Sequence, residues 1–378
     1  MTERIDISVD PKRIEENEEK QQRLEAVHRG EQADRTPVVI DMNLYFMLEK
    51  IGSDFQKAMA SPADNLIQQV LCEKWHLENI DDDGVVPTEA LSFTPFIGCI
   101  RGVEFEMDIS WEGDAPKCSH PLHDPAQIDD LDIPDPDSGL NTMYREWTVG
   151  MQAAAEELEV RINDSPVEIR VSKGHGGGPI PAAFALAGEN MLMWMLTDPE
   201  RMHKLMDIVT TSHINCVRYW DELMGREPSQ QVWLGCDTAE MLSPELYREF
   251  VVPYYNRVWK NFPKRRVMHM CGGIDHLLGI IRDEMQLDFL TGFGFPTDRH
   301  KLSEEFSGRV VMSGGPSPML VKDGSPDAIA AETHDYMATV GRAGGYQLQS
   351  GGGIAVGTSL ENINAMVSAA RASSPAGG

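Results

Sequence analysis

The sequence lacks features that would place it in a membrane, in a secretory pathway or on nucleic acid. It has no apolar run of about 18 residues, so no segment is predicted to cross a membrane as a helix. Its 33 lysines and arginines face 60 aspartates and glutamates, and the formal charge of -27 argues against binding to nucleic acid or to an anionic surface. The first residues, from Met1, contain no apolar stretch of the kind found in a signal peptide.

Cysteine is scarce, and its spacing excludes a zinc ribbon or a disulfide framework. The chain has six cysteines in 378 residues and no CxxC pair. This pattern predicts a cytoplasmic protein with reduced thiols, most of which pack in the core. The six are Cys72, Cys99, Cys118, Cys216, Cys236 and Cys271.

What the chain does contain is a repeated alternation of short β-rich runs and longer helical segments. Alternating βα units imply a parallel sheet, and eight of them predict a closed (β/α)8 barrel of the TIM type in an α/β protein. Hydrophobic residues make up 41% of the chain, enough for a large core. The expected strands cover residues 37–41, 77–80, 168–173, 231–236, 266–271, 287–292, 309–313 and 345–350.

The remaining segments are assigned around this barrel. Residues 1–34 are predicted to form an N-terminal helical arm, and residues 35–372 a single barrel domain. Segment 84–140 is rich in Pro, Asp and Gly, and is interpreted as an insertion after the second strand that holds a hairpin or small sheet. The run at 81–83, three aspartates, is expected to be a solvated loop. Residues 373–378 are expected to be a disordered tail.

Polar residues and glycines follow most of the expected strands. Barrel enzymes place their chemistry at the carboxyl ends of the strands, so this pattern favours an enzyme over a structural scaffold. Ordinary loops, helix caps and packing remain alternatives for each of these residues. The predicted catalytic residues are Asp41, Asp237 and His175, and the predicted substrate-binding residues are Lys173, Asn43, Tyr45 and Gln349.

The fifth expected strand ends in His269-Met270-Cys271 and then breaks at Gly272-Gly273. In an extended chain, residues two apart point to the same face, so the imidazole and the thiol would meet at one point. Both groups are zinc ligands. Two ligands do not complete a site, and the best third ligand is Cys236 because it closes the neighbouring strand, with Asp237 next.

An ordered series of short motifs spans residues 178 to 363. Through it, the second half resembles the uroporphyrinogen decarboxylase superfamily and, within it, the zinc- and corrinoid-dependent methyltransferases. The first half matches only in the order of its strands and helices. The motifs are Gly178-Pro179, Leu186-Ala187-Gly188-Glu189, Leu196-Thr197-Asp198-Pro199-Glu200, Leu242-Ser243-Pro244-Glu245-Leu246-Tyr247, Pro253-Tyr254, His269-Met270-Cys271-Gly272, Gly314-Gly315-Pro316, Ser350-Gly351-Gly352-Gly353-Ile354 and Glu361-Asn362-Ile363.

The resemblance implies an α/β barrel with its active site at the strand ends. The decarboxylase branch carries an arginine-rich segment after the first strand, and residues 41–47 here contain no arginine. The methyltransferase branch has three zinc ligands. His269 and Cys271 match two of them, while the third, a cysteine in that branch, falls on Gly352.

Three functions therefore stay open. The first is a zinc-assisted methyltransferase that moves a methyl group between a small methylated substrate and a thiol or a corrinoid protein. No Asp-x-His-x-x-Gly corrinoid signature is present, and residues 275–279 have the wrong spacing, so a corrinoid would arrive on a separate protein. The second is a metal-free decarboxylase or lyase that acts on a small carboxylated substrate. The third is a pocket that binds a ligand without turning it over.

Overall fold

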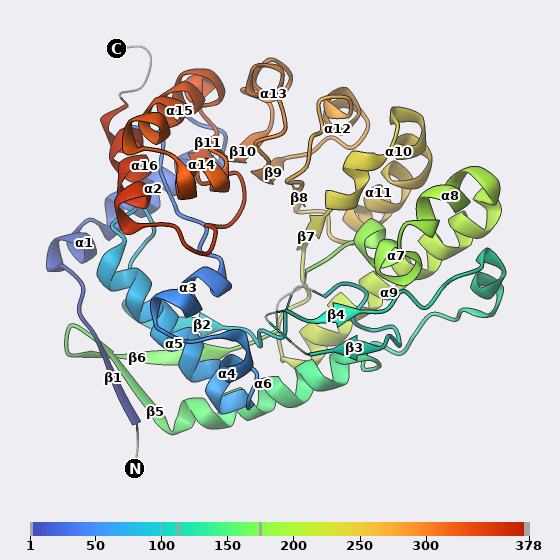
Figure 1. Ribbon diagram of the computed structural model, residues 1–378, viewed down its shortest axis with the longest axis horizontal. Coiled ribbons are helices and arrows are strands. Elements are labelled where there is room, and N and C mark those ends of the chain that lie inside the picture. Colours follow the sequence, from blue (N-terminus) through green and yellow to red (C-terminus); the bar gives the residue numbers. More distant parts are fainter. Residues whose placement is uncertain (1–2, 99, 112, 114, 174–175, 374–378) are drawn as a thin grey trace.

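A five-stranded parallel sheet forms the centre of the larger part of the protein (Figure 1). The computed structural model describes residues 3–98, 100–111, 113, 115–173 and 176–373. The strand order is β11-β10-β9-β8-β7, and the pairing places Gly235, His269 and Thr291 side by side. The strands are β7 (Gln231–Gly235), β8 (Arg265–His269), β9 (Phe289–Phe293), β10 (Val311–Gly314) and β11 (Tyr346–Leu348).

The helices that follow these strands begin at side-chain caps. Ser243, Asp298, Ser317, Ser325 and Ser359 each accept a hydrogen bond from a backbone N–H in the first turn of a helix, which satisfies a group that would otherwise lack a partner. These five helices are α10 (Pro244–Phe250), α13 (Arg299–Phe306), α14 (Pro318–Asp323), α15 (Pro326–Thr339) and α16 (Leu360–Ala372), and the others on this side are α7 (Pro179–Ala187), α8 (Asn190–Thr197), α9 (Pro199–Leu223), α11 (Val252–Asn261) and α12 (Leu278–Asp283).

A second sheet of four strands packs on its own core. Its order is β1-β5-β6-β2, with the β5–β6 pair antiparallel and the other two pairs parallel. The β5–β6 turn is Asn163-Asp164, both at positive φ, as a two-residue hairpin requires. The strands are β1 (Glu3–Ile7), β2 (Ala90–Phe93), β5 (Leu158–Ile162) and β6 (Ser165–Val171), with helices α5 (Pro62–Asn79) and α6 (Leu140–Glu156) against them.

The remaining elements are short. A two-stranded ribbon, β3 (Ile109–Ser110) with β4 (Lys117–Cys118), lies within residues 84–140. The single-turn and connecting helices are α1 (Pro11–Glu15), α2 (Asn17–His28), α3 (Leu44–Lys50), α4 (Phe55–Ala58), η1 (Pro125–Asp130), η2 (Asp237–Met241) and η3 (Val340–Ala343). None of the described helices is both long and apolar enough to cross a membrane.

The α/β class and the parallel sheet are confirmed, but the strands of the described residues do not close into a barrel. Residues 37–41 touch β11 through the single bridge Val38–Leu348, and on the other edge Gly235 N donates to Gly177 O at 2.7 Å. The expected strand at 168–173 belongs to the second sheet, as β6. The first 34 residues are not wholly helical, since β1 pairs with β5.

Two local predictions were wrong. Residues 77–79, expected as a strand, are the last turn of α5, because Leu66, Val70 and Leu77 recur on one helical face and bury it. In the aspartate run only Asp81 is exposed, at 52% of its side chain, and the other two are buried. Asp83 is fully buried and Asp82 is 1% exposed, because their carboxylates accept backbone N–H groups of the segment at 37–40. The tail at 374–378 lies outside the described residues.

Candidate functional site

Three side chains with metal-ligating atoms meet at the carboxyl ends of β7 and β8. Asp237 begins η2 directly after β7, His269 ends β8, and Cys271 follows two residues later. Asp237 Oδ1 lies 3.5 Å from His269 Nε2 and 3.2 Å from Cys271 Sγ. The three ligand atoms all lie within 4.8 Å of one another. We call these three residues the rim cluster.

Neighbouring loops hold the backbone that carries Cys271. Asp237 Oδ1 accepts from Cys271 N at 3.0 Å, and Glu240 Oε2 accepts from Gly273 N at 2.9 Å. The buried Thr297 hydroxyl donates to Gly272 O at 3.0 Å, so the 271–273 turn is anchored on both sides. The backbone at Gly294 packs closely against the carbonyl of Cys271, since a Cβ at Gly294 would lie 1.5 Å from Cys271 O.

The imidazole of His269 lies between the indole ring of Trp233 and the backbone of Gly292, which has no side chain. The Trp233 ring lies 5.3 Å from it, centroid to centroid, and Trp233 Nε1 donates to Thr291 Oγ1 at 3.0 Å. Gly292 has φ 58, and a Cβ there would lie 2.5 Å from His269 Cε1. The ring can occupy its position only because residue 292 is glycine.

We therefore expect Gly292→Ala to impair the rim cluster more than it impairs folding. Positive φ with a Cβ costs about 1–3 kcal/mol, and the clash would also displace the imidazole. The matched control is Gly225→Ala, with φ 60 and no atom within 4 Å of the added Cβ. Zinc titration and thermal unfolding of both variants check this. Equal zinc affinity in the two variants would contradict it.

The electrostatics of the rim cluster disfavour an ionised thiol in the absence of a cation. Burial, and then the negative charge of Asp237, raise the pKa of Cys271 to about 12. The pKa of Asp41 is also raised, because the surrounding protein removes water from its carboxyl group, while His269 acts in the opposite direction. A bound cation would reverse the balance at the thiol, since a metal ion stabilises the thiolate.

The donor set of the rim cluster suits zinc. It offers one sulfur, one imidazole nitrogen and one carboxylate oxygen, the three ligand types that zinc takes in proteins. Zinc binds them at about 2.0–2.3 Å, which places tetrahedral ligands roughly 3.3–3.8 Å apart. The separations of 3.2 and 3.5 Å are close to that range. Three protein ligands leave a fourth position open, as in catalytic zinc sites.

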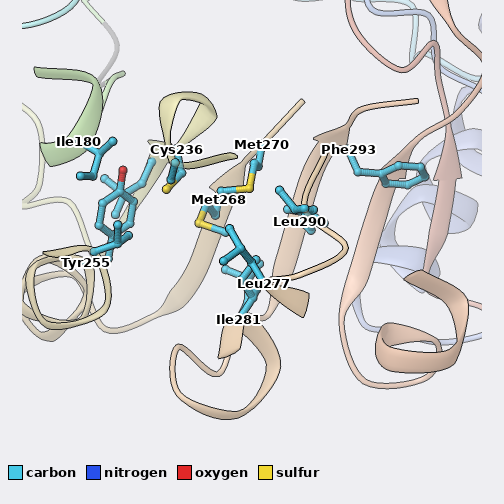
Figure 2. Close-up of a cluster of buried hydrophobic side chains, with 14 of the residues drawn as sticks. Ile180, Cys236, Tyr255, Met268, Met270, Leu277, Ile281, Leu290 and Phe293 are labelled. Atoms are coloured by element: carbon cyan, nitrogen blue, oxygen red, sulfur yellow. The ribbon is translucent and has the colours of Figure 1, made fainter. Parts of the chain in front are cut away.

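Cys236, the first-choice third ligand, points away from the rim cluster. It is fully buried, its sulfur lies 4.0 Å from Tyr247 Oη, and burial raises its pKa to about 12. Figure 2 shows its side chain among Ile180, Tyr255 and Met268 in the core. The chain leaves extended geometry at Cys236, with φ -142 and ψ 21, and Asp237 is the residue that reaches the rim. Asp237, the second choice, is the residue whose carboxylate lies together with His269 and Cys271.

Two more of the predicted residues lie beside the rim cluster. Asp41 is coupled electrostatically to His269. Gln349 follows β11, and its Nε2 lies 3.6 Å from the point where a Cβ of Gly292 would stand, next to the imidazole. A side-chain amide and a carboxyl group therefore lie near the imidazole of His269.

Asn43 and Tyr45 have structural contacts of their own. Asn43 caps α3, with Oδ1 accepting from Tyr45 N at 2.9 Å. The Tyr45 ring packs 5.8 Å from Phe55 and 5.6 Å from Phe96, measured between centroids. His175 lies outside the described residues.

Gly352, where the resemblance implies a cysteine, offers no side-chain ligand to the rim cluster. It has φ 146, and an added Cβ would meet Pro318 Cγ at 3.4 Å with no atom of the rim cluster within 4 Å.

Lys173 contacts a different set of residues. Its Nζ lies 4.5 Å from the centroid of Tyr144 and 5.8 Å from that of Trp220, and it lines a small cavity with Glu104 and Cys216. Burial lowers the pKa of Lys173 to about 8, although Glu104 opposes the shift. None of the rim cluster residues lines this cavity.

This shift predicts a pH dependence of stability. Between pH 8 and the ordinary pKa of 10.5 the unfolded lysine holds a proton that the folded one has released, so the contribution of Lys173 to stability rises with pH across this window. Below pH 8 the folded lysine is charged, and the full cost of burying that charge lowers the stability. Buried thiols such as Cys271, whose pKa is raised, act in the opposite direction above pH 9, so the effect of Lys173 is measured as a difference from the wild type. Between pH 7.5 and 10 in urea unfolding, the free energy of unfolding of Lys173→Met should fall relative to that of the wild type, whereas that of the surface variant Lys57→Met should stay parallel to it. A pH dependence of Lys173→Met that is identical to that of the wild type would contradict the assignment.

Comparison with known proteins agrees with this architecture. The family model described as "Uroporphyrinogen decarboxylase (URO-D)" matches residues 19–373. A methylated-thiol–coenzyme M methyltransferase of Methanosarcina mazei is 25% identical over 329 residues, covering 82% of this chain and 84% of the relative. A uroporphyrinogen decarboxylase of Crocosphaera subtropica is 24% identical over 363 residues, covering 91% of this chain and 93% of the relative.

The fold is also shared with a solved structure. A methyltransferase from Methanosarcina mazei superposes with a TM-score of 0.65 and 19% identity, covering 93% of this chain and 98% of that one. The family match and the shared fold lead to one conclusion: the chain belongs to the uroporphyrinogen decarboxylase family.

Proposed function

We propose that the protein is a zinc-assisted methyltransferase that moves a methyl group between a small methylated substrate and a thiol or a corrinoid protein. The observation that carries the proposal is the rim cluster, in which Asp237, His269 and Cys271 bring three zinc-type ligands within 4.8 Å of one another. The methylated-thiol methyltransferase among the relatives supports the same reaction class.

When bound, zinc would keep a thiol in its nucleophilic thiolate form, or would act as a Lewis acid on the group that leaves the methyl carbon. The chain's own residues prepare this site. Asp237 fixes the Cys271 backbone through its N–H, and Trp233 orients the imidazole. Near His269, Asp41 is the proposed catalytic carboxyl group and Gln349 the proposed substrate contact.

A decarboxylase is the second candidate. Several relatives are named uroporphyrinogen decarboxylase, and one of them spans more of the chain than the methyltransferase does. The raised pKa of Asp41 favours a carboxyl group that can donate a proton, which such a reaction needs. Against it stands the segment at 41–47, which offers no arginine to a polycarboxylated substrate.

Metal analysis combined with a product assay tests the proposal. Protein prepared with ample zinc should hold about one zinc ion per chain, as expected for a single site, and His269→Ala and Cys271→Ala should hold almost none. Holoprotein should demethylate a member of a panel of methylated thiols, with a thiol or a corrinoid protein as acceptor. Both variants should lose this activity by at least about 1000-fold.

The two alternative functions predict different results in the same experiment. A protein that takes up no zinc and releases carbon dioxide from a carboxylated substrate would be a decarboxylase. Tight binding of a ligand that is returned unchanged, with no turnover of either substrate class, would mean that the pocket only binds.

A further inference from the structure

A cavity of about 410 Å³ lies at the amino-terminal ends of β8, β9 and β10. Its walls include Arg29 just after α2, Lys264 and Arg265 at the start of β8, Asp288 before β9 and Arg309 before β10. Strand β8 runs from Arg265 in this cavity to His269 in the rim cluster, roughly 13 Å along the strand. The two sites are therefore at opposite ends of one sheet, and we call this one the basal cavity.

The charge of the basal cavity is opposite to that of the protein. Four cationic side chains line it against one carboxylate, in a chain with 27 more acidic than basic residues. Within the described part of the chain only Arg29 forms an ion pair, with Glu25 at 3.7 Å and Glu31 at 2.9 Å. Lys264, Arg265 and Arg309 have no carboxylate oxygen within 4.0 Å there, although acidic residues are abundant.

The single carboxylate in the basal cavity, that of Asp288, already accepts a backbone hydrogen bond. Asp288 Oδ2 accepts from Arg266 N at 2.8 Å, at the start of β8. That hydrogen bond holds the carboxylate against the sheet. It also partly neutralises the negative charge, which leaves less of it to offset the cationic side chains of the cavity.

Two residues that line the basal cavity, Arg265 and His28, pack against the ring of Phe289. The Arg265 guanidinium lies 4.9 Å from the centroid of Phe289, and His28 packs against the same ring at 5.5 Å. Arg265 Nη2 also donates to His28 O at 2.9 Å. Gly30 and Gly308 form part of the wall, and a Cβ at either position would meet no atom within 4 Å. The cavity wall is therefore open at these two glycines.

We propose that the basal cavity binds a small molecule that carries a multiply charged oxyanion, such as a diphosphate or a phosphate ester. Its volume is within the range of small-molecule sites, roughly 300–1,000 Å³. Guanidinium groups pair with phosphate oxygens in a bidentate manner, and a flexible lysine adds a point charge. This site is separate from the proposed methyl transfer and does not depend on it.

Inorganic pyrophosphate is the probe, measured by calorimetric titration of the zinc-loaded protein at low and moderate salt. The wild type should bind one equivalent, more weakly as salt rises. The double variant Lys264→Met, Arg309→Met should bind at least about 10-fold more weakly, as expected from the loss of two of the four charge contacts. A control that removes the same charge elsewhere, Lys12→Met with Lys57→Met, should bind as the wild type does. The zinc content should be unchanged in every variant.

Three results would overturn the proposal. They are no saturable binding, an unchanged affinity in the double variant, and an equal loss in the control. Vesicles containing phosphatidic acid distinguish a lipid headgroup from a free molecule. Binding of the protein to these vesicles that disappears in the double variant would overturn the assignment to a small soluble ligand.

Discussion

Asp237→Ala should lose zinc, with an affinity at least about 100-fold below that of the wild type. The substitution removes the oxygen ligand of the rim cluster, and also the acceptor that holds Cys271 N at 3.0 Å. Hydrogen bonds that orient metal ligands are alone worth about 10–100-fold in metal affinity, so the loss of a ligand together with such a bond should exceed that. Competition with a chromophoric chelator measures the affinity directly.

Cys236→Ala is the matched control, because it alters the residue next in sequence that was also a candidate ligand. Its thiol is buried among Tyr247 and Tyr255, so the variant should lose some stability to a cavity but keep wild-type zinc affinity. The reverse pattern, with zinc retained in Asp237→Ala and lost in Cys236→Ala, would mean that the strand end rearranges around the metal and that the thiol is the third ligand.

The parallel sheet could be predicted from the sequence because its strands carry local signals. Val267 and Met268 are a buried apolar pair followed by glycines, and the other four strands read in a similar way. The second sheet could not be predicted, because β1 alternates charged and apolar residues over only five positions and pairs with β5, 155 residues away. Pairing at that distance depends on the tertiary fold rather than on either segment.

The sequence likewise predicted some features of the candidate site and not others. The spacing of His269 and Cys271 indicated that the two side chains would converge, and Asp237 was visible as a polar strand end. The choice between Asp237 and Cys236 depends on the backbone turn at residue 236, which the sequence does not specify. Glu240 and Thr297, which anchor the 271–273 turn, carry no motif and come from segments more than 20 residues away from it.

Asp83, which the sequence presents only as one of three consecutive acidic residues, lies at the centre of a buried network of hydrogen bonds. Its carboxylate is fully buried and accepts from Arg23 at 3.1 Å, from both terminal nitrogens of Arg35 at 2.5 and 2.6 Å, and from Val38 N at 2.8 Å. It thereby joins α2 to the segment that bridges to β11.

Asp83→Ala should lower the free energy of unfolding by about 3–5 kcal/mol, since it leaves the largely buried Arg23 and Arg35 without this partner and Val38 N without an acceptor. Asp34→Ala removes the other partner of the same arginine. Asp34 is 63% exposed, so the ion pair, although short at 2.7 Å, is screened by solvent, and its loss should cost about 1 kcal/mol or less. Urea unfolding of both variants at pH 7 measures the difference. Equal and small losses would mean that water or a neighbouring side chain replaces the Asp83 carboxylate, and that this network does not hold α2 to the sheet.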